Sequence, residues 1–132
     1  MYNLLFTVVL LAFLCGVSCR KQHDVSALEN TTWHLKKLVD GNDNESVPKS
    51  IEITATFTEG QLTGSGSCND YWADYTATGG QISVTLRAAT KINCPTDWEA
   101  RYFAALRGSQ SWELSGSTLT IQCADALLLF KR

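Results

Sequence analysis

The sequence predicts one small α+β domain that is mostly β, with antiparallel strands and a single helix packed against them. Apolar and polar residues alternate over residues 51–58 and again over residues 81–87, which is typical of strands with one buried face. Short glycine-containing turns follow these and other apolar segments, as in antiparallel hairpins. Only residues 96–108 show the apolar spacing of a helix, and a chain of 132 residues allows one domain.

The strands follow from the alternation and from the turns between them. Trp33 and Leu35 share one face of the first strand, whereas residues 40–50 have the composition of a loop. Glu59-Gly60 and Gly79-Gly80 are tight turns, so each is expected to close a hairpin. The predicted strands cover residues 31–38, 51–58, 62–64, 71–78, 81–87, 112–114, 119–123 and 126–130.

The predicted helix lies between the turn residues Pro95 and Gly108. Thr96 and Glu99 have the spacing of a capping box, in which the Thr96 hydroxyl accepts from the Glu99 amide and the Glu99 side chain reaches back. One face of the helix is apolar and is expected to pack on the sheet; it consists of Trp98, Tyr102, Phe103 and Leu106.

The N-terminus has the features of an export signal. Residues 4–19 are nearly all apolar, which is too short for a membrane-spanning helix of ~20 residues and close to a signal-peptide core of ~7–15 residues. Gly16-Val17-Ser18-Cys19 resembles a bacterial lipobox, in which the cysteine is lipidated and becomes the first mature residue. We therefore expect residues 1–18 to be a signal peptide and Cys19 to be the lipidation site.

Two other interpretations of this segment remain open: a plain cleaved signal, and an uncleaved anchor. In the second, Arg20 and Lys21 would keep the C-terminal domain in the cytoplasm. For the lipoprotein, residues 19–30 are expected to be a tether and residues 31–132 the domain. Arg20 follows the cysteine in place of the aspartate of an inner-membrane retention signal, so we expect the outer membrane, facing the periplasm.

The composition limits the kinds of partner and cofactor that we expect for this protein. A net charge of -2 implies no nucleic-acid partner, and the sequence predicts no cofactor. Export brings the chain into an oxidising compartment, where disulfides form. Cys68, Cys94 and Cys123 lack the close spacing of zinc ligands, so we expect no metal site.

Catalytic patterns are weak. Ser65 and Ser67 lie in the segment Gly64-Ser65-Gly66-Ser67-Cys68, which is not Gly-x-Ser-x-Gly. The two histidines of the chain are poorly placed to serve as a base, because His23 is in the tether and His34 is predicted to face away from Trp33.

Paired aspartates offer no better site. Asp70 and Asp74 would be ~13 Å apart along a strand, beyond the ~5–9.5 Å of paired catalytic carboxylates. We expect no catalytic residue and no enzyme.

The chain from Leu28 to Phe130 resembles the META domain family, which includes heat-shock proteins of the HslJ type. The family opens with a Trp-x-Leu strand, here Trp33-His34-Leu35, and continues with a Gly…Gly-Cys-Asn segment, a tyrosine and Thr-x-x-x-Cys before a helix. Ser67 stands where the family has the second of these glycines. The matching residues are Gly64, Cys68, Asn69, Tyr75, Thr90, Cys94, Glu99, Phe103 and Leu106.

The resemblance implies a sheet curved into a partial barrel with the helix packed across it. It also implies an envelope lipoprotein linked to stress or antibiotic tolerance, with no established catalytic site. We therefore expect a non-enzymatic module acting through contacts with an unknown envelope protein. The alternative is a carrier of small apolar ligands on the concave face of the sheet; an open cavity beneath Trp33, Trp72 and Trp112 would favour it, and a filled core would favour the first.

The cysteines of the domain allow three intramolecular pairings. Cys123 shares strand parity with Leu119 and Ile121, which places it on the buried face as a lone thiol. Cys68 and Cys94 flank irregular segments and are also the two cysteines of the family pattern. We therefore predict a Cys68–Cys94 disulfide and a free Cys123.

Overall fold

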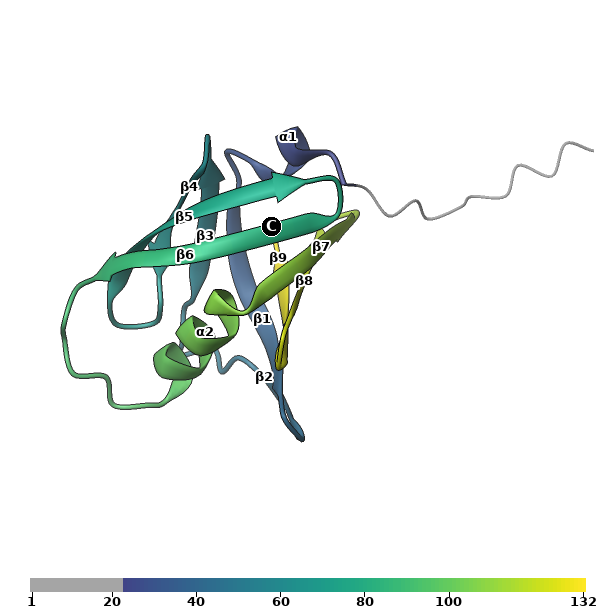
Figure 1. Ribbon diagram of the computed structural model, residues 1–132. Helices are drawn as coiled ribbons and strands as arrows, with labels where there is room; N and C mark the ends of the chain where they lie inside the picture. The colour runs from purple at the N-terminus through teal and green to yellow at the C-terminus, as the bar shows by residue number, and fades with distance from the viewer. Residues whose placement is uncertain (1–22) are drawn as a thin grey trace, which may run out of the picture.

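The computed structural model describes residues 23–132, so the predicted signal peptide, Cys19 and the first part of the tether lie outside the described residues. The elements are α1 (Val25–Leu28), β1 (Thr32–Asp40), β2 (Asp43–Ser46), β3 (Thr54–Thr58), β4 (Gln61–Ser65), β5 (Asp70–Thr78), β6 (Gln81–Ala89), α2 (Trp98–Arg107), β7 (Ser109–Ser115), β8 (Thr118–Cys123) and β9 (Ala126–Lys131) (Figure 1). Within the described part of the chain, neither helix has the length and apolar character needed to span a bilayer.

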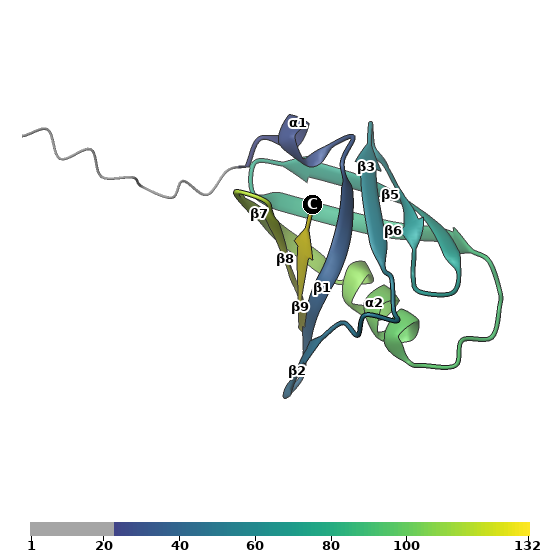
Figure 2. The same cartoon turned by 180° about the vertical axis from the view of Figure 1, so that it is seen from behind.

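Eight of the strands close into an antiparallel barrel, which confirms the predicted mostly β domain and the curvature of its sheet. The strands from β3 to β9 follow one another in chain order, and β1 closes the circle by pairing with both β3 and β9. The seam between β6 and β7 is short, because their register joins only Gln81 and Ser111. The two helices lie toward opposite ends of the barrel (Figures 1 and 2).

The barrel interior is filled by apolar side chains. Along β3 and β4 the inward positions are Ala55, Phe57 and Leu62, in keeping with the alternation of the sequence. The turn between these strands has Glu59 at φ 46° and Gly60 at φ 84°, the positive values that a two-residue hairpin requires. The largest fully buried side chains come from both helices and most of the strands: Trp33, Tyr71, Tyr102, Phe57, Phe130, Leu28, Leu38, Ile53, Leu62, Leu106, Leu119 and Ile121.

Two elements lie in segments that the sequence predicts to be irregular. Residues 25–28 of the predicted tether form α1, because Leu28 is fully buried and its carbonyl accepts the indole N–H of Trp33 at 3.0 Å. The predicted loop over residues 40–50 contains β2, which pairs antiparallel with β1 although all its side chains are exposed. With no buried face, β2 has no apolar alternation by which sequence could identify it.

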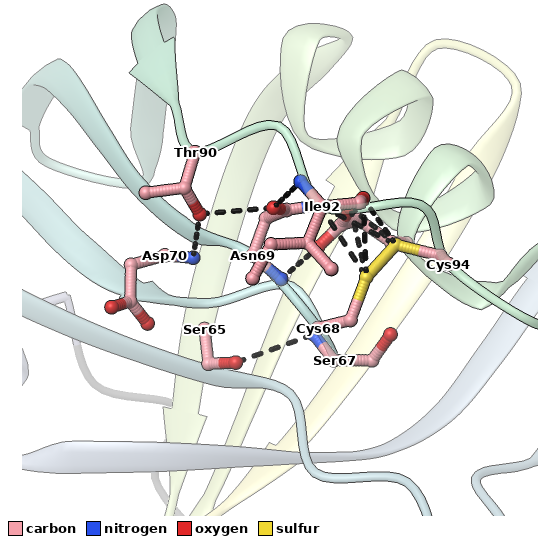
Figure 3. The surroundings of a disulfide bond; sticks show 9 residues. Ser65, Ser67, Cys68, Asn69, Asp70, Thr90, Ile92 and Cys94 are labelled. Atoms are coloured by element: carbon pink, nitrogen blue, oxygen red, sulfur yellow. Dashed lines mark hydrogen bonds between the residues drawn. A yellow bond between two sulfur atoms is a disulfide. The ribbon is translucent and has the colours of Figure 1, made fainter.

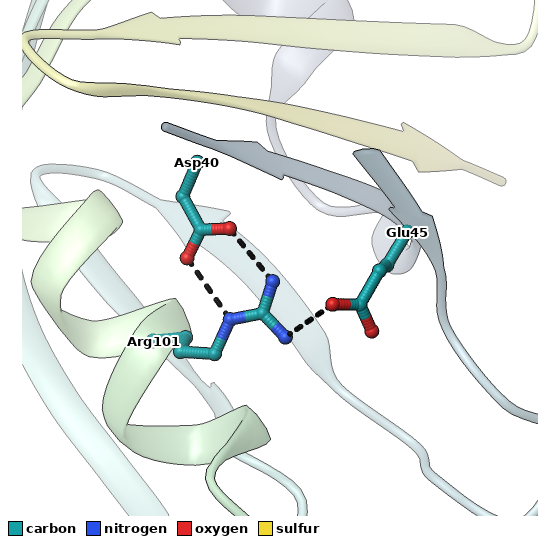
Figure 4. Close-up of polar contacts among 3 residues, drawn as sticks. All are labelled: Asp40, Glu45 and Arg101. Atoms are coloured by element: carbon teal, nitrogen blue, oxygen red, sulfur yellow. Dashed lines mark hydrogen bonds and ion pairs between the residues drawn. The ribbon is translucent and has the colours of Figure 1, made fainter. Parts of the chain in front are cut away.

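An ion pair connects α2 to the β1–β2 hairpin. Arg101 donates through Nε and Nη2 to the two carboxylate oxygens of Asp40, at 2.9 and 2.7 Å, and through Nη1 to Glu45 at 3.2 Å (Figure 4). These hydrogen bonds from Arg101 lower the pKa of the Asp40 carboxyl below its ordinary 3.8. The side chains of Arg101 and Asp40 are only 16% and 29% exposed, so solvent screens the pair less than a surface pair.

We expect Arg101→Gln to lower the free energy of unfolding by about 1–2 kcal/mol at pH 7, because it removes charge-assisted hydrogen bonds. The pKa of Asp40 is lower in the folded state, so its contribution is present above the unfolded value near 3.8 and is lost as the pH falls through the folded value. Urea unfolding of the wild type and the variant at pH 7 and pH 3 measures the difference in their free energies of unfolding. A difference between wild type and variant that stays constant down to pH 3 would contradict the assignment.

Candidate functional site

Two loops far apart in the sequence meet at one end of the barrel, and we call their meeting point the Asn69 junction. It comprises Cys68, Asn69, Thr90, Ile92, Cys94 and Glu99 (Figure 3, which labels all of these except Glu99). The first loop connects β4 to β5, and the second leads from β6 to α2. Pairing of β5 with both β4 and β6 brings the loops together.

Asn69 is the centre of the junction. Only 3% of the residue is exposed, and every hydrogen-bonding position of its amide is used. Its Oδ1 accepts from Thr90 Oγ1 at 2.9 Å and from the Ile92 amide at 2.7 Å. Its Nδ2 donates to the Ile92 carbonyl at 2.9 Å and to Glu99 Oε2 at 2.6 Å. One side chain therefore connects the loop after β6 to the helix.

Glu99 is a carboxylate buried in this junction, with 7% of the residue exposed. Its second oxygen accepts from the backbone amide of Asn69 at 2.8 Å, so Asn69 binds both carboxylate oxygens. Gly66 makes this approach possible, since a Cβ there would lie 2.6 Å from Glu99 Oε1 and 2.7 Å from Phe103 Cζ. A side chain at position 66 would displace the carboxylate.

The predicted capping box is therefore wrong. Asp97 is the N-cap of α2, with helical backbone angles and no side-chain hydrogen bond to the helix, and Glu99 bonds to Asn69 instead of reaching back. A buried partner with two N–H donors stabilises the carboxylate more than one exposed helix end does. The Thr96-x-x-Glu99 spacing was a chance match to the motif.

Thr96→Ala is accordingly expected to change the free energy of unfolding by less than about 0.5 kcal/mol, below the ~1 kcal/mol of a lost N-cap. Chemical denaturation of the two proteins measures the difference. Ser109→Ala is a useful comparison, because the Ser109 hydroxyl does bond the end of α2, donating to the Leu106 carbonyl at 2.7 Å. A loss of about 1 kcal/mol or more in the Thr96 variant would mean that Thr96 does cap the helix.

A disulfide joins the two loops beside Asn69. It links Cys68 to Cys94, the pair predicted from the sequence, with Cα atoms 5.9 Å apart. Cys123 is a free thiol among the described residues and is buried in β8, where burial raises its pKa to about 11. Glu99 Oε2 lies 3.0 Å from the sulfur of Cys94 and 3.8 Å from that of Cys68.

The remaining residues of the family pattern lie outside the junction. Gly64 passes so close to the Thr54 carbonyl that a Cβ would collide with it. Tyr75 donates its hydroxyl to Glu29 Oε1 at 2.7 Å, near α1, and burial together with that carboxylate raises the Tyr75 pKa to about 12. Of the nine residues that match the family pattern, the junction thus unites Cys68, Asn69, Thr90, Cys94 and Glu99.

The weak catalytic candidates are dispersed over the structure. His34 lies 3.5 Å from the exposed Glu52, and Asp74 forms an exposed ion pair with Arg87 at 2.6 Å. Ser65 accepts a hydrogen bond from the Ser67 amide at 3.4 Å. Among residues 23–132, none of these contacts places a histidine beside Ser65 or Ser67.

The tryptophans considered as a ligand site do not share a cavity. Trp33 and Trp112 are buried in the barrel, whereas Trp72 points outward and is 48% exposed. Ile92, 64% exposed, is the other large apolar side chain exposed in residues 23–132. Trp72 is opposite Ala88 near the start of β5, and Ile92 follows the end of β6, so both lie at the barrel end that holds the Asn69 junction.

Comparison with known proteins identifies the fold. The META domain family model matches residues 26–132. A solved structure of a protein from Burkholderia xenovorans is 23% identical, covers 81% of this chain and 84% of its own, and has a TM-score of 0.68. A DUF4847 family protein from Bacteroides vulgatus is 16% identical, covers 80% of this chain and 94% of its own, and has a TM-score of 0.61. No curated protein sequence matches the chain.

Proposed function

Because the chain belongs to the META domain family, we propose that it is an envelope lipoprotein that acts through protein contacts and not through catalysis. Cys19 carries the lipid in this proposal, and the outer membrane facing the periplasm is its location. The link of the family to stress or antibiotic tolerance is part of the same proposal. The observation that supports it best is the filled barrel, whose interior side chains leave a carrier little room for a ligand.

In this proposal the anchored end and the contact surface lie at opposite ends of the barrel. His23 packs on Gly80 and lies edge-on to Trp112, with ring centroids 5.8 Å apart. Cys19 is four residues before His23 and so at most ~14 Å from it. Lipidation would therefore hold the turn between β5 and β6 close to the bilayer.

The Asn69 junction lies at the other end of these strands. β5 runs nine residues from the junction to that turn, a distance of ~26 Å along the strand. An anchored domain would thus present Trp72 and Ile92 away from the membrane. Exposed aromatic and aliphatic side chains on one face are common in protein interfaces.

Site-specific photo-crosslinking in intact cells tests this function. A photoreactive residue at Ile92 is expected to give a discrete protein adduct that is reduced at least fivefold by Trp72→Ala. The same residue at Gln81, which is also exposed but lies at the anchored end, is the matched control and is expected to give none of that adduct. Equal adducts from both positions, or none from Ile92, would count against contact through the distal end.

A further inference from the structure

We propose that the Cys68–Cys94 pair, when reduced, forms a zinc site with Glu99. The two sulfurs and one carboxylate oxygen of Glu99 all lie within 4.8 Å of one another. Cys and Glu side chains are zinc ligands, and three protein ligands with a water are a common zinc arrangement. The spacing of the cysteines does not indicate such a site, because the third ligand comes from α2.

The distances fit a tetrahedral metal. Bonds of about 2.3 Å to sulfur and 2.0 Å to oxygen, at a tetrahedral angle, place sulfur and oxygen about 3.5 Å apart. Glu99 Oε2 lies 3.0 Å from Cys94 Sγ and 3.8 Å from Cys68 Sγ, on either side of that value. Reduction breaks the S–S bond, and the two sulfurs must then move to about 3.8 Å apart, the separation that two Zn–S bonds at a tetrahedral angle require.

Asn69 supplies the surrounding hydrogen bonds that metal ligands need. It donates to both oxygens of Glu99, and its Nδ2 lies 3.4 Å from each cysteine sulfur. The carboxylate is therefore fixed in orientation before any metal arrives, as in zinc sites whose ligands are held by outer hydrogen bonds. The site is also reachable, because both cysteines are partly exposed and a surface groove of about 490 Å³ runs past Cys94 and Glu99.

Charge makes metal binding depend on the redox state. The disulfide sulfurs are neutral, so Glu99 is the one anionic ligand of the oxidised site. An envelope dithiol can break the S–S bond, becoming a disulfide itself and leaving one proton on each cysteine sulfur. Zn²⁺ would then form two Zn–S bonds and release both protons to solvent, and its two positive charges would offset two of the three negative charges of the thiolates and the carboxylate. Exchange with a disulfide of another molecule restores the Cys68–Cys94 bond, leaves that molecule as a dithiol that has taken two protons from solvent, and releases the ion.

The test uses the full chain with Cys15→Ala and Cys19→Ala, so that its thiols are those of Cys68, Cys94 and Cys123. After reduction with a water-soluble phosphine, one equivalent of Co²⁺ is expected to give thiolate-to-cobalt absorption, which Zn²⁺ displaces. Zn²⁺ is also expected to raise the melting temperature of the reduced protein, since it binds the folded state. Neither effect is expected of the oxidised protein.

Variants separate this site from chance binding to thiols. Glu99→Gln should weaken Zn²⁺ binding at least about tenfold, and Cys94→Ser should abolish the cobalt absorption. Cys123→Ser, which removes a thiol outside the site, should leave both unchanged. Reduced protein that shows no cobalt–thiolate absorption, that is unfolded and not refolded by Zn²⁺, or that binds equally well with Gln at position 99 would overturn the proposal.

Discussion

Asn69→Ala is expected to lower the free energy of unfolding by about 3 kcal/mol or more. The substitution removes the hydrogen bonds of a fully used buried amide, one of which goes to a buried carboxylate. A neutral buried hydrogen bond contributes about 1 kcal/mol and one to a charged group about 1.5–3 kcal/mol. Glu99 would keep only the backbone amide of residue 69 for one oxygen, leaving the other oxygen buried without that donor.

Urea unfolding of the purified domain measures this loss. Asp70→Ala is the matched control, because Asp70 is the adjacent residue but its side chain is exposed and only its backbone contributes, with its amide donating to Thr90. The control is expected to change stability by less than about 0.5 kcal/mol. A loss below 1 kcal/mol for Asn69→Ala would mean that the junction does not depend on its central amide.

Replacing both Cys68 and Cys94 by Ala is expected to lower the free energy of unfolding by about 3.5 kcal/mol. The bridge spans 26 positions, and the loss of loop-closure entropy in the unfolded chain gives that value. The loss is expected even though Asn69 still connects the same two loops, because the disulfide acts mainly on the unfolded state.

Denaturation with and without reductant isolates this effect. Reductant should destabilise the wild type, in the absence of metal, by about as much as the double substitution does, and it should leave the double variant unchanged. Cys123 should not contribute to the effect of reductant, because it is buried and forms no disulfide. Wild-type protein whose unfolding is insensitive to reductant would show that Cys68 and Cys94 are not bonded in solution.

Much of the fold could be predicted because a strand or helix with one buried face has apolar residues at regular spacing in the sequence. The structure contains three of the predicted features: the alternation around Ala55 and Phe57, the Glu59-Gly60 turn and the apolar face of α2. β2 and α1 could not be predicted in the same way. The first has no buried face, and the second is a single turn whose one fully buried residue is Leu28.

The candidate site could be predicted only in part. The strand parity of Cys123 and the family pattern predict the pairing of Cys68 with Cys94, and both cysteines lie in the junction. The sequence does not reveal the role of Glu99, because its local spacing to Thr96 matches a capping box while its true partner, Asn69, is 30 positions away. Short sequence patterns reflect contacts between residues close in the chain, whereas the pairing of strands in the barrel determines which loops meet at its end.

Intact-mass measurement of the protein extracted from cell membranes tests the lipoprotein proposal most directly. We expect a chain that begins at Cys19, carries acyl groups on that residue, and is two hydrogens lighter than its fully reduced form because of the Cys68–Cys94 bond. A soluble chain that begins elsewhere and carries no acyl group would contradict the account.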